Sequence, residues 1–149
     1  MLRPDPQGDC RLTSAPPSGS DVKRVLFVCI ENSNRSQMAE AFARIHGHGR
    51  VEAYSAGSRP SGRINPAAIQ SMAELGYDLS SHRSQSLDAI PRFEFAAVVT
   101  MGCGDSCPAL AARQREDWEI PDPKSMPPEQ FSEVRDLIET RVRDLLTRL

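Results

Sequence analysis

Short apolar segments that alternate with segments of helical periodicity are the feature that most constrains the fold of this chain. The first apolar segment contains β-branched and aromatic side chains and stops abruptly at Cys29, and a polar loop and a helix-like pattern follow at once. Strands are predicted for residues 24–29, 51–57, 95–101 and 118–120. Because strands that alternate with helices form parallel sheets, the sequence predicts a three-layer α/β fold, in which helices flank a four-stranded parallel sheet.

Three helices are predicted between and after these strands. Residues 36–47 carry apolar side chains at helical spacing and end at Gly47, a typical helix stop. A second helix has Pro66 in its first turn and ends at Gly76. From Glu129 onward a single apolar stripe continues to the end of the chain, which predicts a long final helix.

The length of 149 residues indicates one domain, predicted for residues 23–149. Residues 1–22 are rich in Pro, Ser, Gly and Asp and predict a flexible N-terminal tail, in which Cys10 has no expected role. The 20 acidic and 18 basic side chains nearly balance, so neither nucleic acid nor a membrane surface is an expected partner. No apolar run approaches the roughly 20 residues of a membrane span. We therefore expect a cytoplasmic location, where cysteines are normally kept reduced.

Several candidate active-site residues follow the carboxyl ends of the predicted strands. These residues are Cys29, Gly57, Cys103 and Asp122. In open parallel sheets the active residues gather at this edge, in the crevice where the strand order switches. The sequence therefore predicts one site to which several strands contribute.

The loop after Cys29 has the composition of an oxyanion-binding loop. Its residues are Ile30, Glu31, Asn32, Ser33, Asn34 and Arg35. A strand, a tight loop and a helix N-terminus point several backbone N–H groups inward, and the helix dipole adds positive potential. The guanidinium of Arg35 offers a planar fork of donors to a tetrahedral oxyanion. Hydrogen bonds from the loop and from Ser36 would favour the thiolate of Cys29, which is the nucleophilic form.

Simpler interpretations exist for the same residues. Cys29 could be a buried cysteine at a strand end, with Arg35 on the helix surface. Asp122 could belong to an ordinary turn, because Asp-Pro is a common turn former. Arg59 and Arg63 could steer anions toward the site, but solvated loop charges are the simpler interpretation.

A non-enzymatic alternative is a zinc-held or anion-sensing module. Cys103 and Cys107 would supply half of a zinc site, and His46 and His48 would complete it. Cys-x3-Cys with His-x-His is a weak zinc pattern. The two histidines also follow a helix that would carry them away from the edge where the strands end.

Four motifs, in order, resemble those of the arsenate reductases built on the low-molecular-weight protein tyrosine phosphatase fold. They are "VLFVCIENSNRSQMAEAF", "YSAGS", "VVTMGCGDSCP" and "WEIPDP". The resemblance covers about residues 24–147 and implies a four-stranded parallel sheet flanked by helices. It implies arsenate as substrate, phosphate and sulfate as analogues, and no cofactor.

The resemblance also implies residue roles. Cys29 matches the nucleophile, Arg35 the oxyanion-binding arginine and Ser36 the hydroxyl that supports the thiolate. Asp122 matches the aspartate that protonates the leaving oxygen.

Cys103 and Cys107 match the redox pair of these reductases. In the implied cascade Cys103 attacks Cys29 and releases arsenite, and Cys107 then forms a disulfide with Cys103. A thioredoxin-type or glutaredoxin-type partner would reduce that disulfide by thiol exchange. Only three residues separate the two cysteines, fewer than in well-known thioredoxin-coupled members.

Some members of the family bind potassium, and part of the ligand set has counterparts here. Asn32, Glu40 and Ser55 match three of the ligands, whereas Gln85 stands where the fourth is acidic. Because a neutral amide oxygen ligates more weakly than a carboxylate, the resemblance implies at most a weak potassium site.

The alternative enzymatic function is that of a low-molecular-weight protein tyrosine phosphatase or a phosphatase of small phosphate esters. The loop and Asp122 would serve either reaction, because both begin with thiolate attack on a tetrahedral oxyanion. A phosphatase has no use for two further cysteines at the same edge. The resembling phosphatases also tend to carry an aromatic residue after Asp-Pro, whereas this chain has Lys124 and Ser125.

Overall fold

The structure is a computed structural model that describes residues 22–91, 94–102 and 110–149. The predicted tail, except for Val22, lies outside the described residues, and so does Cys10. Cys103 and Cys107 also lie outside them.

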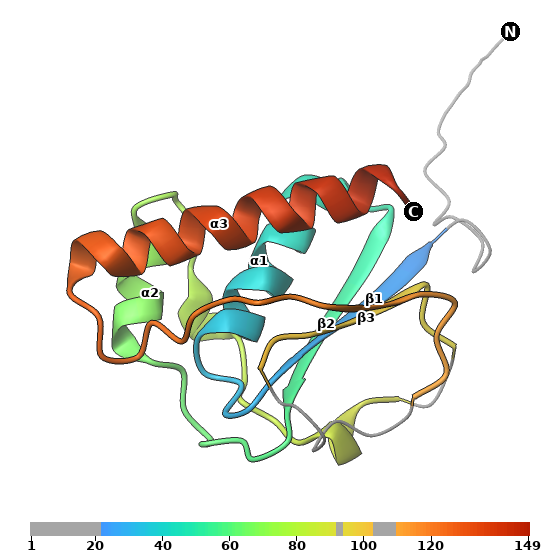
Figure 1. Ribbon diagram of the computed structural model, residues 1–149, viewed down its shortest axis with the longest axis horizontal. Coiled ribbons are helices and arrows are strands. Elements are labelled where there is room, and N and C mark those ends of the chain that lie inside the picture. Colours follow the sequence, from blue (N-terminus) through green and yellow to red (C-terminus); the bar gives the residue numbers. More distant parts are fainter. Residues whose placement is uncertain (1–21, 92–93, 103–109) are drawn as a thin grey trace, which may run out of the picture.

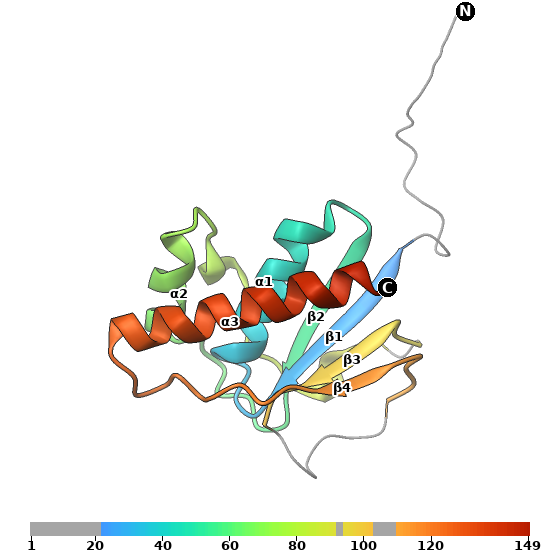
Figure 2. The ribbon, with the colours of Figure 1, turned by 45° about the horizontal axis from the view of Figure 1, so that its top comes forward.

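Four parallel strands form the sheet in the order β2-β1-β3-β4. The strands are β1 (Lys23–Cys29), β2 (Val51–Gly57), β3 (Ala97–Thr100) and β4 (Arg115–Asp117). In the described part of the chain, three α-helices pack on one face of this sheet (Figures 1 and 2). They are α1 (Arg35–Gly47), α2 (Pro66–Ala73) and α3 (Pro128–Thr147).

The side chains of β1 alternate between two apolar cores, as the period of a strand requires. Val25 and Phe27 join the large core beneath the helices, whereas Leu26 and Val28 join a smaller core on the other face. Leu87, from the short 3-10 helix η3 (Leu87–Ala89), packs against that smaller core. The predicted fold class is thus confirmed, but the second flanking layer contains η3 and loops in place of an α-helix.

The fourth strand was predicted at the wrong residues. It spans Arg115–Asp117, not residues 118–120, and pairs with Val98–Thr100. Because β4 is an edge strand of three charged residues, of which Arg115 and Asp117 are exposed, no apolar run marks it in the sequence. Trp118 and Ile120 are buried, but they pack into the core just after the strand ends.

The second helix and the third strand were predicted too long, and the final helix was predicted to start one residue too late. The second helix ends at Ala73, and turns lead from there to Gly76, whose φ of 82° suits glycine. The third strand spans Ala97–Thr100, within the predicted residues 95–101. The final helix begins at Pro128, one residue before the predicted start.

Candidate active site

The predicted loop lies between the carboxyl end of β1 and the N-terminus of α1, where the strands end together. Cys29 is in register with Gly57 at the end of β2. A Cβ atom on Gly57 would lie 2.5 Å from the carbonyl oxygen of Ile30. A glycine is therefore needed at this position if the loop is to pack directly on β2.

The carbonyl groups of the loop point outward, toward the segment that follows β2. Each bond runs from a backbone N–H of that segment to a loop carbonyl: Ser58 to Cys29, Arg59 to Ile30, Ser61 to Glu31 and Asn65 to Ser33, at 2.8–3.2 Å. Within the described residues, no backbone N–H of residues 30–34 donates to another carbonyl. These N–H groups are therefore available to an oxyanion.

Asn32 fixes the centre of the loop. Its φ is 52°, in the left-handed region that asparagine tolerates better than most residues. Its Nδ2 donates to Ser36 Oγ at 2.8 Å, and its Oδ1 accepts from the backbone N–H of Gln85 at 2.9 Å. Gln37 Nε2 donates to its backbone carbonyl at 2.9 Å. The loop conformation thus depends on α1 and on the segment around residue 85.

The sulfur of Cys29 lies 2.9 Å from Ser36 Oγ, and Cys29 is only 2% exposed. Because Ser36 Oγ accepts a hydrogen bond from Asn32, its own hydrogen is available to the sulfur. A hydroxyl that donates to sulfur stabilises the thiolate relative to the thiol. The N-terminus of α1 adds favourable potential at the same place.

Ser36→Ala is expected to slow alkylation of Cys29 by iodoacetamide about three- to tenfold at pH 7, because a charge-assisted hydrogen bond to the thiolate is lost. The rate is measured at Cys29 itself by peptide mass mapping. Ser132→Ala, a serine-to-alanine change on α3, serves as the matched control. An unchanged rate in Ser36→Ala would show that the hydroxyl does not support the thiolate.

Arg35 begins α1 and is 7% exposed. Its Nη1 donates to the carbonyl of Ile120 at 3.0 Å, and its Nη2 lies 3.8 Å from Asp122 Oδ2. A Cβ atom on Gly102, whose φ is 85°, would lie 2.7 Å from Arg35 Nη1. Sequence analysis missed Gly102, and its position just after a predicted strand was the only signal for it.

Asp122 lines the same pocket as Cys29, Arg35 and the loop. Its side chain is half exposed, and its Oδ1 accepts from the backbone N–H of Lys124 at 3.1 Å. Asp122 therefore makes a turn contact and also faces the anion pocket. The ammonium of Lys124 lies 3.0 Å from Glu31 Oε2, so an ion pair joins the two sides of the pocket mouth.

Of the two histidines in the zinc alternative, His46 contacts a residue of α3. His46 Nε2 lies 2.8 Å from Glu139 Oε2, on α3. The two cysteines of that alternative lie outside the described residues. Across residues 22–91, 94–102 and 110–149, no three His, Cys, Asp or Glu side chains are grouped as a metal site would require.

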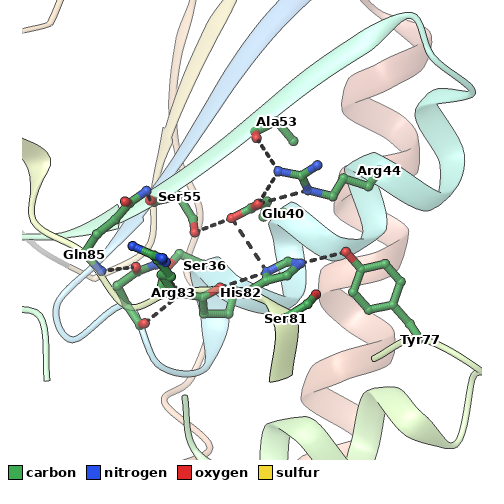
Figure 3. Close-up of polar contacts among 12 residues, drawn as sticks. Ser36, Glu40, Arg44, Ala53, Ser55, Tyr77, Ser81, His82, Arg83 and Gln85 are labelled. Atoms are coloured by element: carbon green, nitrogen blue, oxygen red, sulfur yellow. Dashed lines mark hydrogen bonds and ion pairs between the residues drawn. The ribbon is translucent and has the colours of Figure 1, made fainter. Parts of the chain in front are cut away.

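A partly buried polar network that sequence analysis did not predict lies behind the loop (Figure 3). His82 Nδ1 is 3.0 Å from Gln37 Oε1, and His82 Nε2 is 2.6 Å from the hydroxyl of Tyr77. Gln37 Nε2 donates to two carbonyls, so its Oε1 must face the ring, and His82 Nδ1 must therefore carry a proton. Burial lowers the pKa of His82 and so favours the neutral ring, in which Nε2 accepts from Tyr77.

Among the described helices, none combines the length and the apolar character that crossing a membrane requires.

The chain is similar to proteins of known family. Residues 24–149 match the family described as low molecular weight phosphotyrosine protein phosphatase. A glutaredoxin arsenate reductase from Synechocystis sp. is 37% identical over 131 residues, which cover 86% of this chain and 99% of the relative.

Solved structures agree with this likeness. A structure described as an arsenate reductase in the phosphate binding state has a TM-score of 0.79 and 35% identity, over 85% of this chain and 98% of the other. A thioredoxin-dependent arsenate reductase from Corynebacterium glutamicum has a TM-score of 0.72 and 32% identity, over 87% of this chain and 63% of the other.

Proposed function

This chain belongs to the low molecular weight phosphotyrosine protein phosphatase family, and on that premise we propose that it is an arsenate reductase. The observation that carries the proposal is the full-length similarity to a relative named for arsenate reduction, 37% identical over 99% of its length. The geometry supports it, because Cys29, Arg35 and Asp122 line one pocket beside the available N–H groups of the loop.

In the first step the thiolate of Cys29 attacks the arsenic atom of arsenate. An As–S bond forms, and one oxygen leaves as water after Asp122 supplies a proton. Arg35 and the N–H groups of the loop hold the remaining oxygens, on which negative charge gathers as the reaction proceeds. Ser36 supports the attacking sulfur through the 2.9 Å contact between Oγ and Sγ.

In the second step the sulfur of Cys103 attacks the sulfur of Cys29. An S–S bond forms and the As–S bond breaks. The electron pair of the broken bond stays on arsenic, which leaves as arsenite. Cys107 then attacks Cys103, which frees Cys29 and leaves a Cys103–Cys107 disulfide. Two thiols are thus oxidised for each arsenic atom reduced from As(V) to As(III).

A dithiol protein of the thioredoxin or glutaredoxin type would reduce the final disulfide. The names of two relatives support one reductant each, because one is a glutaredoxin arsenate reductase and another is thioredoxin-dependent. Both reductants act by the same thiol exchange, so the residues of the anion pocket suit either.

The mouth of the pocket favours a small inorganic anion over an aryl phosphate. The Glu31–Lys124 ion pair lies beside Asp122, where an aromatic residue would otherwise wall a phenyl ring. No aromatic side chain is among the residues that line the described pocket. This arrangement supports arsenate reduction over phosphatase activity toward phosphotyrosine.

Asp122→Asn is expected to lower kcat for arsenate about 10²-fold, with a smaller change in KM, because the amide cannot protonate the leaving oxygen. Initial rates over a range of arsenate concentrations separate the two constants. Asp88→Asn, an equivalent change at an exposed residue of η3, should leave both constants unchanged. A fall in kcat of less than threefold for Asp122→Asn would contradict this role.

The proposed function is tested by arsenate-dependent oxidation of NADPH. One assay is coupled through thioredoxin and thioredoxin reductase, and a second through glutaredoxin, glutathione and glutathione reductase. Turnover is expected with one of the two systems, and it should be lost in Cys103→Ser and Cys107→Ser. Hydrolysis of p-nitrophenyl phosphate without any arsenate-dependent oxidation would instead identify a phosphatase.

A further inference from the structure

The carboxylate of Glu40 is a buried charge that needs a counter-charge. Glu40 lies on α1, one turn after Ser36, and is 8% exposed. A buried carboxylate is costly unless a cation pairs with it and hydrogen bonds satisfy its oxygens. In some members of the family that cation is potassium, for which Asn32, Glu40 and Ser55 match three ligands.

In this chain Arg44 supplies the positive charge, from the next turn of α1. Its Nε and Nη2 both donate to Glu40 Oε2, at 2.9 and 2.7 Å, and its Nη2 also lies 3.3 Å from the carbonyl oxygen of Ala53 (Figure 3). The other oxygen, Oε1, accepts from Ser55 Oγ at 2.6 Å. Both oxygens of Glu40 are therefore occupied by donors of the protein.

The oxygens of Asn32 and Ser55, two of the residues that match potassium ligands, also accept hydrogen bonds from the protein. Asn32 Oδ1 accepts from the backbone N–H of Gln85, and the carbonyl of Ser55 accepts from Gln85 Nε2 at 3.0 Å. Because a carbonyl can only accept, Gln85 must turn its NH2 group toward β2. Gln85 stands at the position of the fourth potassium ligand, where an oxygen is needed, but it turns an N–H donor to that side. The residues present therefore do not fit a bound potassium ion.

We propose that the guanidinium of Arg44 takes the place of the alkali-metal cation beside Glu40, so that the protein works without potassium. Arg44 is then a positioning residue, because it does not touch the anion pocket. Its effect reaches Cys29 through consecutive contacts of Glu40, Ser55, Gln85, Asn32 and Ser36. The contacts of Gln85 with Ser55 and Asn32 tie β2 to the loop that holds Cys29.

The test measures the thermal unfolding temperature and arsenate turnover in potassium chloride and in choline chloride, at the same ionic strength. The wild-type protein should show the same unfolding temperature in both salts, and turnover within about 1.5-fold. In choline, Arg44→Ala should unfold at a lower temperature than the wild type. Potassium should raise that temperature by several degrees, because the vacated oxygens of Glu40 and Ala53 can then bind the ion and binding stabilises the folded state.

Three further variants sharpen the test. Arg44→Lys keeps the charge and should respond to potassium less than Arg44→Ala. Arg44→Ala combined with Glu40→Gln should lose the response, because the buried charge is gone. Arg143→Ala removes an exposed arginine of α3 and should behave as wild type.

Two results would overturn the inference. One is a wild-type protein whose unfolding temperature is several degrees higher, or whose turnover is severalfold faster, in potassium than in choline. The other is an Arg44→Ala variant that responds to potassium no more than wild type. Only the turnover comparison rests on the proposed function; the unfolding comparison holds even if the protein does not reduce arsenate.

Discussion

Arsenate reduction should fall by about 10⁴-fold or more in Cys29→Ser, because a serine hydroxyl is not ionised near neutral pH and cannot form the mixed disulfide that releases arsenite. The fold should persist, since oxygen is smaller than sulfur and can keep the contact with Ser36. The unfolding temperature of this variant should therefore lie within a few degrees of the wild-type value. Turnover is measured as arsenite formed in the presence of an excess of reductant.

The matched control is Cys10→Ser, which makes the same change at a cysteine with no expected role. Its turnover should equal that of the wild type. If Cys29→Ser retained more than a few per cent of wild-type turnover, another residue would be the nucleophile, and the account of the loop would be wrong.

The second largest effect is expected for Arg35→Lys, with kcat/KM for arsenate lower by about 10²–10³-fold. Lysine keeps the positive charge but not the planar fork. In the wild type one arm of this fork is held by the carbonyl of Ile120, and Gly102 leaves room beside it. A lysine ammonium cannot bind Ile120 and two oxygens of the anion in the same geometry.

The loss should appear in binding as well as in turnover. Titration calorimetry with phosphate, used as an arsenate analogue, should show weaker binding to Arg35→Lys. Arg59→Lys makes the same change at an exposed residue after β2 and should leave both binding and turnover near wild type. A kcat/KM for Arg35→Lys within tenfold of wild type would show that charge alone, and not the fork, holds the oxyanion.

Much of the site could be predicted because its signals are local. The apolar run that ends at Cys29 predicted β1, and the polar loop was predicted between this strand and a helix, where the structure has it. Asp122 was placed correctly at the same pocket even though the strand before it was displaced by three residues. The prediction was displaced because β4 is a charged edge strand. The buried Trp118 and Ile120 after it have the apolar, alternating pattern that is typical of a strand.

The rest could not be predicted because it depends on contacts between distant segments. His82 lies 45 residues from Gln37, and Gln85 lies 53 residues from Asn32, yet each pair is hydrogen-bonded. The pairing of Arg44 with Glu40 is local, at four residues, and common on helices. The sequence does not show that Glu40 is buried, and this burial is what the proposed replacement of a cation rests on. The roles of Cys103 and Cys107 stay predictions.

A single turnover without any external reductant tests directly whether Cys103 and Cys107 supply the two electrons that reduce arsenate. The fully reduced protein, which has four cysteines, is mixed with excess arsenate, and both the arsenite formed and the remaining free thiols are counted. One arsenite per chain and the loss of two thiols are expected, with the new disulfide between Cys103 and Cys107. No arsenite, or arsenite formed while all four thiols remain free, would contradict this role of the two cysteines.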